Sequence, residues 1–331
     1  MNKFIVSPSP HAYSDQSIPK LMYGVIISLL PALAVSVFFF GIGMIIVTTV
    51  SIVSCILFEY LIQKYMMKVK PTHLDGSALL TGLLLAFCLP TNIPFPLVMI
   101  GALAAVGIGK MTFGGLGNNI FNPALVGRVF LFISFPVAMT SWPEAAGQWM
   151  NYTDAVTGAT PLGMMKEGLV TQTVGEIMPR VPSFLHLLIG KTMGSAGEVS
   201  ALALLLGMCY LLYRKIISWH IPITILATVA IFSGILWLAN PDRFADPLFH
   251  LLSGGLMLGA IYMATDYVTS PMNHKGMIIY GVGIGLLTVL IRVFGAYPEG
   301  VQFAILIFNG FTPLINKFVK PSRFGKEVKH V

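Results

Sequence analysis

Residues 154–162 present a hydroxyl group in a defined way; their sequence is Asp-Ala-Val-Thr-Gly-Ala-Thr-Pro-Leu. Pro161 restrains the residue before it to an extended conformation, which presents the hydroxyl of Thr160. A hydroxyl in that position can donate and accept hydrogen bonds. Thr and Gly beside a proline are also typical of an exposed turn ahead of a short helix, and local propensity by itself favours the turn.

A second group of polar side chains lies in residues 113–125, where glycines precede the sequence Asn-Asn-Ile-Phe-Asn-Pro. Asn119 and Asn122 are three residues apart, so they can share one face of a helix, and their amides offer both donors and acceptors. That polar edge suits a uracil-like ring edge. The alternative is a helix cap, in which the asparagines bond to backbone and Pro123 occupies the first turn.

Three charged residues lie within apolar runs, namely Glu59, Arg128 and Arg292. Charges in hydrocarbon are costly and normally face the interior of a bundle or a partner. Arg128 can therefore pair with an anionic ligand or with Glu59, and Arg292 can extend to the interface from a helix end. Asp75 is interpreted as the cap of the helix that follows it, in preference to a role in a ligand site.

The composition identifies the environment in which these residues act. Of the 331 residues, 56% are apolar and only 10% are charged, against about 25% charged in soluble domains. This excludes a soluble enzyme, a disordered chain and a nucleic-acid binder, and it predicts an integral membrane protein surrounded by lipid. The three cysteines form no C-x-x-C pair, which argues against a zinc or iron–sulfur site made by this chain alone.

The apolar runs predict an all-α polytopic membrane protein with about ten transmembrane helices. The expected spans are residues 21–40, 43–62, 76–90, 95–109, 122–139, 198–213, 217–239, 248–264, 276–295 and 300–316. The third span is short and is followed by three prolines, so we expect a broken or re-entrant element.

Charge placement predicts the orientation of the chain. With ten spans, fourteen of the 20 basic residues fall on one side, together with both termini, and eight acidic residues fall on the other. The positive-inside rule makes both termini cytoplasmic. The expected organisation is a cytoplasmic segment 1–20, a membrane repeat 21–139, an extracytoplasmic loop 140–197, a membrane repeat 198–316 and a basic tail 317–331. Five spans on each side of the loop predict an inverted repeat.

Residues 154–162 resemble the D-x-x-(S/T)-G-A-T signature, followed by Pro-Leu, of the membrane subunits of two related respiratory complexes. These are the D subunits of the Rnf complex, a ferredoxin:NAD oxidoreductase, and the B subunits of the sodium-translocating NADH:quinone oxidoreductase. In that signature a flavin transferase attaches FMN to the last threonine through a phosphoester. Thr157 departs from the commoner serine but keeps a hydroxyl, so Thr160 corresponds to the target threonine.

The resemblance runs in order from about Met22 to Leu314. Residues 113–125 resemble the family segment G-G-x-G-x-N-x-x-N-P-A-L, and residues 75–84 resemble D-G-x-x-x-x-T-G-L-L. About 20 residues precede the first span, whereas the B subunits carry an extra N-terminal stretch, so the length favours the Rnf family over the quinone reductases.

The resemblance implies a covalent FMN on Thr160 and a non-covalent riboflavin near the cytoplasmic entrance, where it contacts Asn119 and Asn122. Arg128 is a further candidate flavin contact. The residues expected to form the attachment motif with Thr160 are Asp154, Thr157, Gly158 and Ala159. No catalytic residue and no metal ligand is assigned to this chain.

We therefore expect an electron-carrying subunit of an Rnf-type complex in a bacterial cytoplasmic membrane. Such a complex passes electrons between ferredoxin and NAD(H), coupled to Na⁺ or H⁺ translocation, and its other subunits carry flavin and iron–sulfur centres. The chain alone is not expected to be a complete enzyme, and it has no nucleotide-binding G-x-G-x-x-G fingerprint after a predicted strand. Two alternatives remain: the B subunit of the quinone reductase, and a flavin-free solute channel or transporter with an inverted repeat.

Overall fold

The computed structural model describes residues 16–72, 74–145, 149–150, 152, 156–197 and 200–320. The N-terminal half of these residues contains α1 (Ile18–Phe40), α2 (Ile42–Leu61), η1 (Ile62–Met67), α3 (Ser77–Phe87), α4 (Phe95–Leu103), η2 (Ala104–Ile108), η3 (Met111–Phe113), α5 (Pro123–Ser134) and α6 (Pro136–Met139). The connecting segment contains β1 (Trp142–Pro143), β2 (Thr157–Gly158), α7 (Pro161–Gly168), α8 (Val174–Ile177), η4 (Met178–Arg180) and α9 (Phe184–Ile189). The C-terminal half contains α10 (Ala201–Tyr213), α11 (His220–Ala239), α12 (Pro247–Leu252), α13 (Leu256–Leu258), η5 (Gly259–Met263), α14 (His274–Phe294) and α15 (Val301–Phe318).

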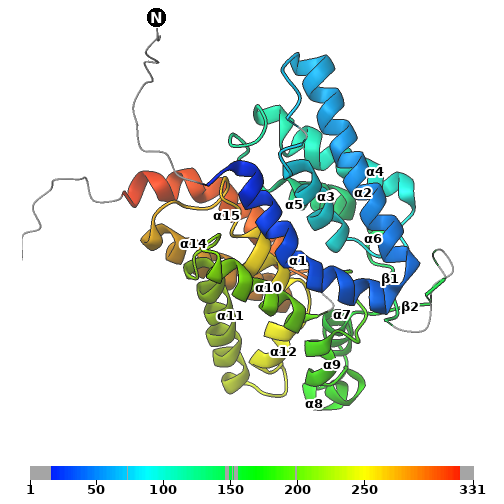
Figure 1. The fold of residues 1–331 in the computed structure, drawn as a ribbon. Coiled ribbons are helices and arrows are strands. Elements are labelled where there is room, and N and C mark those ends of the chain that lie inside the picture. Colours follow the sequence, from blue (N-terminus) through cyan, green and yellow to red (C-terminus); the bar gives the residue numbers. More distant parts are fainter. Residues whose placement is uncertain are drawn as a thin grey trace, which may run out of the picture.

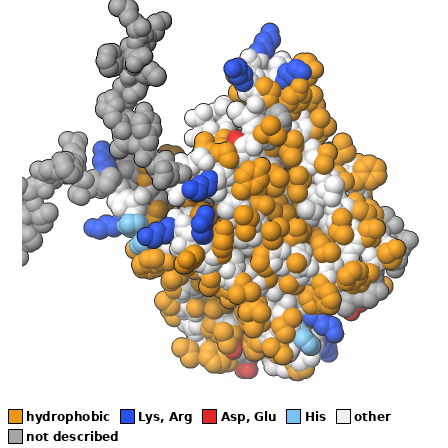
Figure 2. Space-filling model, in the orientation of Figure 1, with side chains coloured by type: hydrophobic (Ala, Val, Ile, Leu, Met, Phe, Trp, Pro, Cys, Tyr) orange, Lys and Arg blue, Asp and Glu red, His pale blue; other side chains and the backbone are white. Residues whose placement is uncertain are grey.

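The described chain is a helical membrane protein, as the composition predicts. Helical stretches long and apolar enough to cross a membrane are Ile18–Phe40, Ile42–Met67, Phe95–Phe113, His220–Ala239 and His274–Phe294. Large apolar side chains cover much of the visible surface, while Lys and Arg gather at its margins (Figure 2). That distribution suits a surface that faces lipid.

The third expected span of each half is interrupted, and the expected span 122–139 is also divided, at Phe135, between α5 and α6. The segment 76–90 contains only the 11-residue helix α3, and the segment 248–264 is divided between α12, α13 and η5. The second interruption includes Gly254, whose φ of +69° is a left-handed conformation that side chains rarely adopt. A broken element was predicted only for residues 76–90, where a short apolar run is followed by three prolines.

The two halves lie side by side and have matching contacts (Figure 1). In the N-terminal half, α2 packs against α3 and α4; in the C-terminal half, α11 packs against α12 and α14. The first helices of the two halves, α1 and α10, contact each other, and so do α5 and α15 near the end of each half. The central packing of one half therefore has a counterpart in the other.

The connecting segment has structure of its own. Helices α7, α8 and α9 enclose a small apolar cluster that is separate from the main core, and α12 completes it. Members of the cluster include Leu162, Ile177, Leu187 and Phe249. Sequence reasoning treated residues 140–197 as one long loop because none of these helices exceeds eight residues.

Gly82 lets α2 and α3 approach closely. A Cβ built on Gly82 would lie 2.7 Å from the Cα of Ile52, and the Ser51 hydroxyl donates to the Gly82 carbonyl at 2.7 Å. Backbone cannot move aside as a flexible side chain can, so a methyl group at residue 82 would separate the two helices.

We expect Gly82→Ala to lower the free energy of unfolding by about 1–3 kcal/mol, the usual cost of overpacking. Gly234→Ala is the matched control, because its Cβ would meet only Pro247, at an ordinary 3.5 Å. The measurement is unfolding of the detergent-solubilised protein. Equal stability of the two variants would contradict the close approach of α2 and α3.

Candidate functional site

Thr160 lies at the N-cap of α7, with an extended backbone (φ −64°, ψ 157°) and Pro161 at the first helical position. Its Oγ1 accepts a hydrogen bond from the backbone N–H of Gly163 at 3.1 Å. The predicted turn ahead of a short helix is confirmed. A phosphate esterified to this oxygen would lie at the positive end of α7, where backbone N–H groups favour anions.

Thr160 lines a cavity, here called the Thr160 cavity, where the connecting segment meets both halves. Other residues that line it are Arg128, Trp142, Ser253, Gly254, Pro298 and Glu299. Arg128 is 3% exposed, and its guanidinium carbon lies 6.0 Å from the ring centroid of Trp142. Sequence reasoning selected Arg128 and Thr160 separately, and the fold brings them into one cavity. The alternative pairing of Arg128 with Glu59 is wrong, because Glu59 pairs with Lys110.

The other described residues of the predicted attachment motif, Thr157, Gly158 and Ala159, lie next to Thr160 in the chain but do not line this cavity. Thr157 and Gly158 form β2, which pairs antiparallel with β1 and places Gly158 opposite Trp142. A Cβ at Gly158 would overlap the sulfur of Met193, so a larger residue there would require the Met193 side chain to move. Ala159 is exposed and lines a neighbouring depression. Asp154 lies outside the described residues.

Arg292 occupies the break in the C-terminal half. It is 5% exposed and donates to the carbonyl oxygens of His250 and Ser253, at 2.6 and 3.0 Å, and to Glu299 Oε1 at 3.1 Å. Glu299 Oε2 also accepts from the N–H of Gly255 at 2.8 Å. The prediction that Arg292 extends to the interface is wrong, because the guanidinium satisfies carbonyls that the break leaves without helical partners.

Sequence reasoning missed the role of Glu299, which it counted only as an acid on the loop before the last span. The available signal was Arg292, a charge within an apolar run that needed a nearby partner of opposite sign. With Glu299 in place, the start of α15 is attached to the break between α12 and α13.

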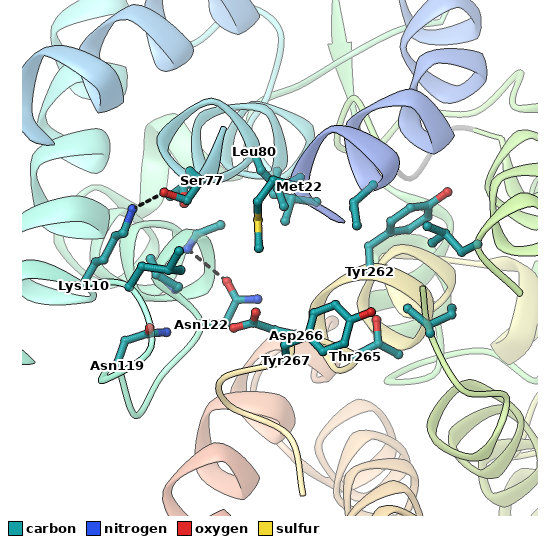
Figure 3. A pocket seen from close by; sticks show the side chains of 18 residues that line it. Met22, Ser77, Leu80, Lys110, Asn119, Asn122, Tyr262, Thr265, Asp266 and Tyr267 are labelled. Atoms are coloured by element: carbon teal, nitrogen blue, oxygen red, sulfur yellow. Dashed lines mark hydrogen bonds between the residues drawn. The ribbon is translucent and has the colours of Figure 1, made fainter. Parts of the chain in front are cut away.

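A second cavity, here called the Asn122 cavity, is lined by both halves (Figure 3). Its polar lining residues are Ser77, Thr81, Lys110, Asn119, Asn122, Tyr262, Thr265, Asp266 and Tyr267. It shares no lining residue with the Thr160 cavity. The described structure therefore contains two separate candidate sites.

Lys110 and Glu59 form a buried ion pair beside the Asn122 cavity. The two charged groups lie 2.6 Å apart, with their side chains 1% and 0% exposed. Lys110 Nζ also donates to Ser77 Oγ at 2.7 Å, and Asp75 Oδ1 accepts from the backbone N–H of Ser77 at 2.8 Å. Asp75 thus accepts from the first N–H of α3, as predicted, while Gly76 is the N-cap residue itself. Lys110, one of the fourteen basic residues counted on the cytoplasmic side, is therefore buried in the protein and not exposed at its surface.

The two predicted asparagines have different roles. Asn122 caps α5: its Oδ1 accepts from the N–H groups of Ala124 and Leu125 at 3.0 and 3.4 Å, and its Nδ2 donates to the Met263 carbonyl at 3.2 Å. This is the helix cap that the sequence left open as an alternative. Asn119 is 3% exposed, and its Oδ1 is buried without a hydrogen-bond partner, which leaves an acceptor for a ligand donor.

Both cavities are narrow. Each has an open volume of about 60 Å³, whereas one water needs about 10–15 Å³ on the same measure. A three-ring ligand would require neighbouring side chains to move. Beside the Asn122 cavity, the loop before α5 has three glycines at positive φ, Gly114, Gly115 and Gly117, and the last two have open space around them, so this loop is suited to such a movement.

Comparison with known proteins decides the family. A family model described as "NQR2, RnfD, RnfE family" matches residues 5–325. The chain belongs to this family. It is 44% identical over 325 residues to the D subunit of the "Proton-translocating ferredoxin:NAD(+) oxidoreductase complex" of Clostridium ljungdahlii, covering 98% of this chain and 97% of that protein.

Two further relatives from this family have comparable coverage. Identity is 44% over 322 residues to the D subunit of the "Na(+)-translocating ferredoxin:NAD(+) oxidoreductase complex" of Acetobacterium woodii, covering 97% of this chain and 95% of the relative. Identity is 38% over 351 residues to the D subunit of the "Ion-translocating oxidoreductase complex" of Cronobacter sakazakii, covering 97% of this chain and 99% of that protein.

The Lys110–Glu59 pair predicts a clear pattern of stability changes. We expect Lys110→Met to lower the free energy of unfolding by about 3–5 kcal/mol, because it leaves the Glu59 carboxylate buried without its cation. The double variant Glu59→Leu with Lys110→Met should recover most of that loss. A double-mutant cycle on the unfolding free energies of the detergent-solubilised variants measures the coupling between the two residues. Losses of the two single variants that simply add in the double variant would contradict a direct pair.

Proposed function

We propose that the chain is the D subunit of an Rnf-type complex, in which it carries electrons between partner subunits while the complex translocates Na⁺ or H⁺. The observation that carries the proposal is identity of 38–44%, over nearly the whole length, to three D subunits of ion-translocating oxidoreductases. Two of these relatives are named for ferredoxin:NAD(+) chemistry, which favours this role over the quinone reductase alternative. All three relatives are named as oxidoreductase subunits, which also favours this role over that of a flavin-free transporter.

The proposed architecture is ten spans in two inverted repeats, with both termini in the cytoplasm and residues 140–197 outside. Its support is that the two halves pack alike: α2 contacts α3 and α4, and in the same way α11 contacts α12 and α14. Both halves also interrupt their third apolar segment. In inverted-repeat transporters, interrupted helices at corresponding positions line the functional site. By this assignment the Thr160 cavity opens outside and the Asn122 cavity opens toward the cytoplasm.

The proposed attachment site of FMN is the Thr160 hydroxyl. Its N-cap position fits a phosphoester, because the attached phosphate would lie at the positive, N-terminal end of α7. Arg128 lies in the lining of the same cavity and supplies a buried positive charge that favours an electron-rich ring. When bound, a flavin supplies one- and two-electron chemistry that no amino-acid side chain of this chain provides.

The Asn122 cavity is the proposed riboflavin site. Asn119 Oδ1 is a buried acceptor without a partner, which fits an imide N–H at the edge of a flavin ring. Asn122 shapes the site by capping α5 and fixing it to η5. Lys110 is held by Glu59 and Ser77, so it contributes a fixed positive charge to the cavity wall.

Thr160→Ala is expected to abolish the covalent flavin, because alanine has no oxygen for the phosphoester. The denatured chain should then lose its yellow-green in-gel fluorescence, whereas Thr160→Ser, which keeps the hydroxyl, should retain part of it. Thr171→Ala is the control, since Thr171 is an exposed threonine on the same segment. A fluorescent band of undiminished intensity in Thr160→Ala would place the covalent attachment elsewhere.

Asn119→Ala is expected to weaken riboflavin retention about tenfold, the effect of losing one or two kcal/mol of hydrogen bonding. The readout is the ratio of acid-extractable riboflavin to protein-bound covalent FMN in the purified complex. Asn118→Ala, at the exposed neighbouring position, serves as control. Full retention of riboflavin in the Asn119 variant would overturn the assignment of this cavity, and the covalent FMN signal would stay unaffected.

A further inference from the structure

A third cavity, here called the basic cavity, lies between α7, α12 and the end of α14, and its volume is about 290 Å³. All of its charged or titratable lining residues are basic: Lys166, Arg243, His250 and Arg292. The rest of the described lining is apolar and includes Leu162, Phe244 and Phe294. A cavity with only basic and apolar side chains suits a ligand that has both an anionic and an apolar part.

Two buried nitrogen atoms of this lining have no hydrogen-bond partner. They are Nδ1 of His250 and Nε of Arg292, on residues that are only 6% and 5% exposed. Buried polar atoms are nearly always hydrogen-bonded, so two orphaned atoms in one cavity indicate an absent partner. Arg292 Nε is a donor, and His250 Nδ1 is a donor in the tautomer that carries its proton there, so an oxyanion that accepts from several donors at once can satisfy both.

Of the other two basic residues, Lys166 lies in the wall of the cavity and Arg243 lies at its mouth. Lys166 Nζ donates to the carbonyl oxygens of Gly295 and Tyr297, at 2.5 and 2.8 Å, and burial lowers the pKa of this lysine. Arg243 is exposed and its guanidinium carbon lies 5.9 Å from the ring centroid of Phe244. A long exposed side chain at the mouth can swing onto a ligand without disturbing the fold.

The position of the cavity indicates which anion it takes. It lies at the C-terminal end of α14, a membrane-length helix, where Phe244 and Phe294 are in edge contact at 6.4 Å between ring centroids. Aromatic and basic residues at a helix end are typical of the boundary between hydrocarbon and water, where phospholipid headgroups lie. An apolar wall beside a cationic one accommodates an acyl chain beside a phosphate.

We propose that the basic cavity binds the phosphate of an anionic phospholipid. The phosphate contacts Arg243, His250 and Arg292, and one acyl chain lies along Phe244 and Phe294. This inference requires that the chain is inserted in a membrane. It does not depend on whether a flavin is bound. The basic cavity shares Leu162 and Pro298 with the Thr160 cavity, so an occupied lipid site also stiffens the wall beside Thr160.

The test uses the purified complex in nanodiscs of phosphatidylcholine with a minor fraction of phosphatidylglycerol, with retained lipid measured by native mass spectrometry. We expect retained phosphatidylglycerol to fall at least fivefold in Arg243→Gln and in Val170→Glu, which adds a negative charge at an exposed lining residue. Arg180→Gln and Thr171→Glu are matched controls, because they make the same charge changes at exposed positions outside the lining.

Selective loss in the two lining variants supports the proposal. Equal retention in lining and control variants overturns it, and so does a wild-type complex that retains no more phosphatidylglycerol than its disc composition predicts. A parallel arm adds inorganic phosphate to discs of phosphatidylcholine alone. Phosphate adducts that disappear in Arg243→Gln, without any enrichment of phosphatidylglycerol, would assign the anion site to free phosphate and overturn its assignment to lipid.

Discussion

Backbone carbonyl and N–H groups cannot be left unpaired in hydrocarbon, and this constraint shapes the places where the chain interrupts its helices. The break between α12 and α13 frees carbonyl groups at His250 and Ser253, and Arg292 donates to both. The positive charge then needs its own partner, which Glu299 provides. A single interruption thereby requires an arginine, a carboxylate and a left-handed glycine, Gly254, within one small volume.

A comparable arrangement occurs in the N-terminal half. Lys110 follows η2, lies next to the start of the short helix α3 and is balanced by Glu59. In each half, a buried cation near the end of the fourth apolar segment contacts the interrupted third segment. The cation is Lys110 in the N-terminal half and Arg292 in the C-terminal half. These polar clusters are the parts of an apolar protein in which a redox ligand could be held and its charge balanced, and each lies beside one of the two candidate flavin cavities.

Much of the fold could be predicted from the sequence, because hydropathy and proline placement depend on local residue types. The helical membrane class, the N-cap geometry of Thr160 and the capping by Asp75 all follow from residues close together in the chain. The pairing of Lys110 with Glu59 and the meeting of Arg128 with Thr160 do not, since each joins residues that are far apart in the chain. Asn122 shows a third case: its sequence allowed a cap or a ligand contact, and only the hydrogen bonds identify the cap.

Thr160 and Arg128 line one cavity at the start of α7, and this cavity is the proposed FMN site. An experimental density map of the assembled complex tests it most directly. We expect density continuous with Oγ1 of Thr160, with a planar ring system inside the cavity lined by Arg128, Trp142 and Pro298. An unmodified Thr160, or an attached ring that lies outside this cavity and away from Arg128, would contradict it.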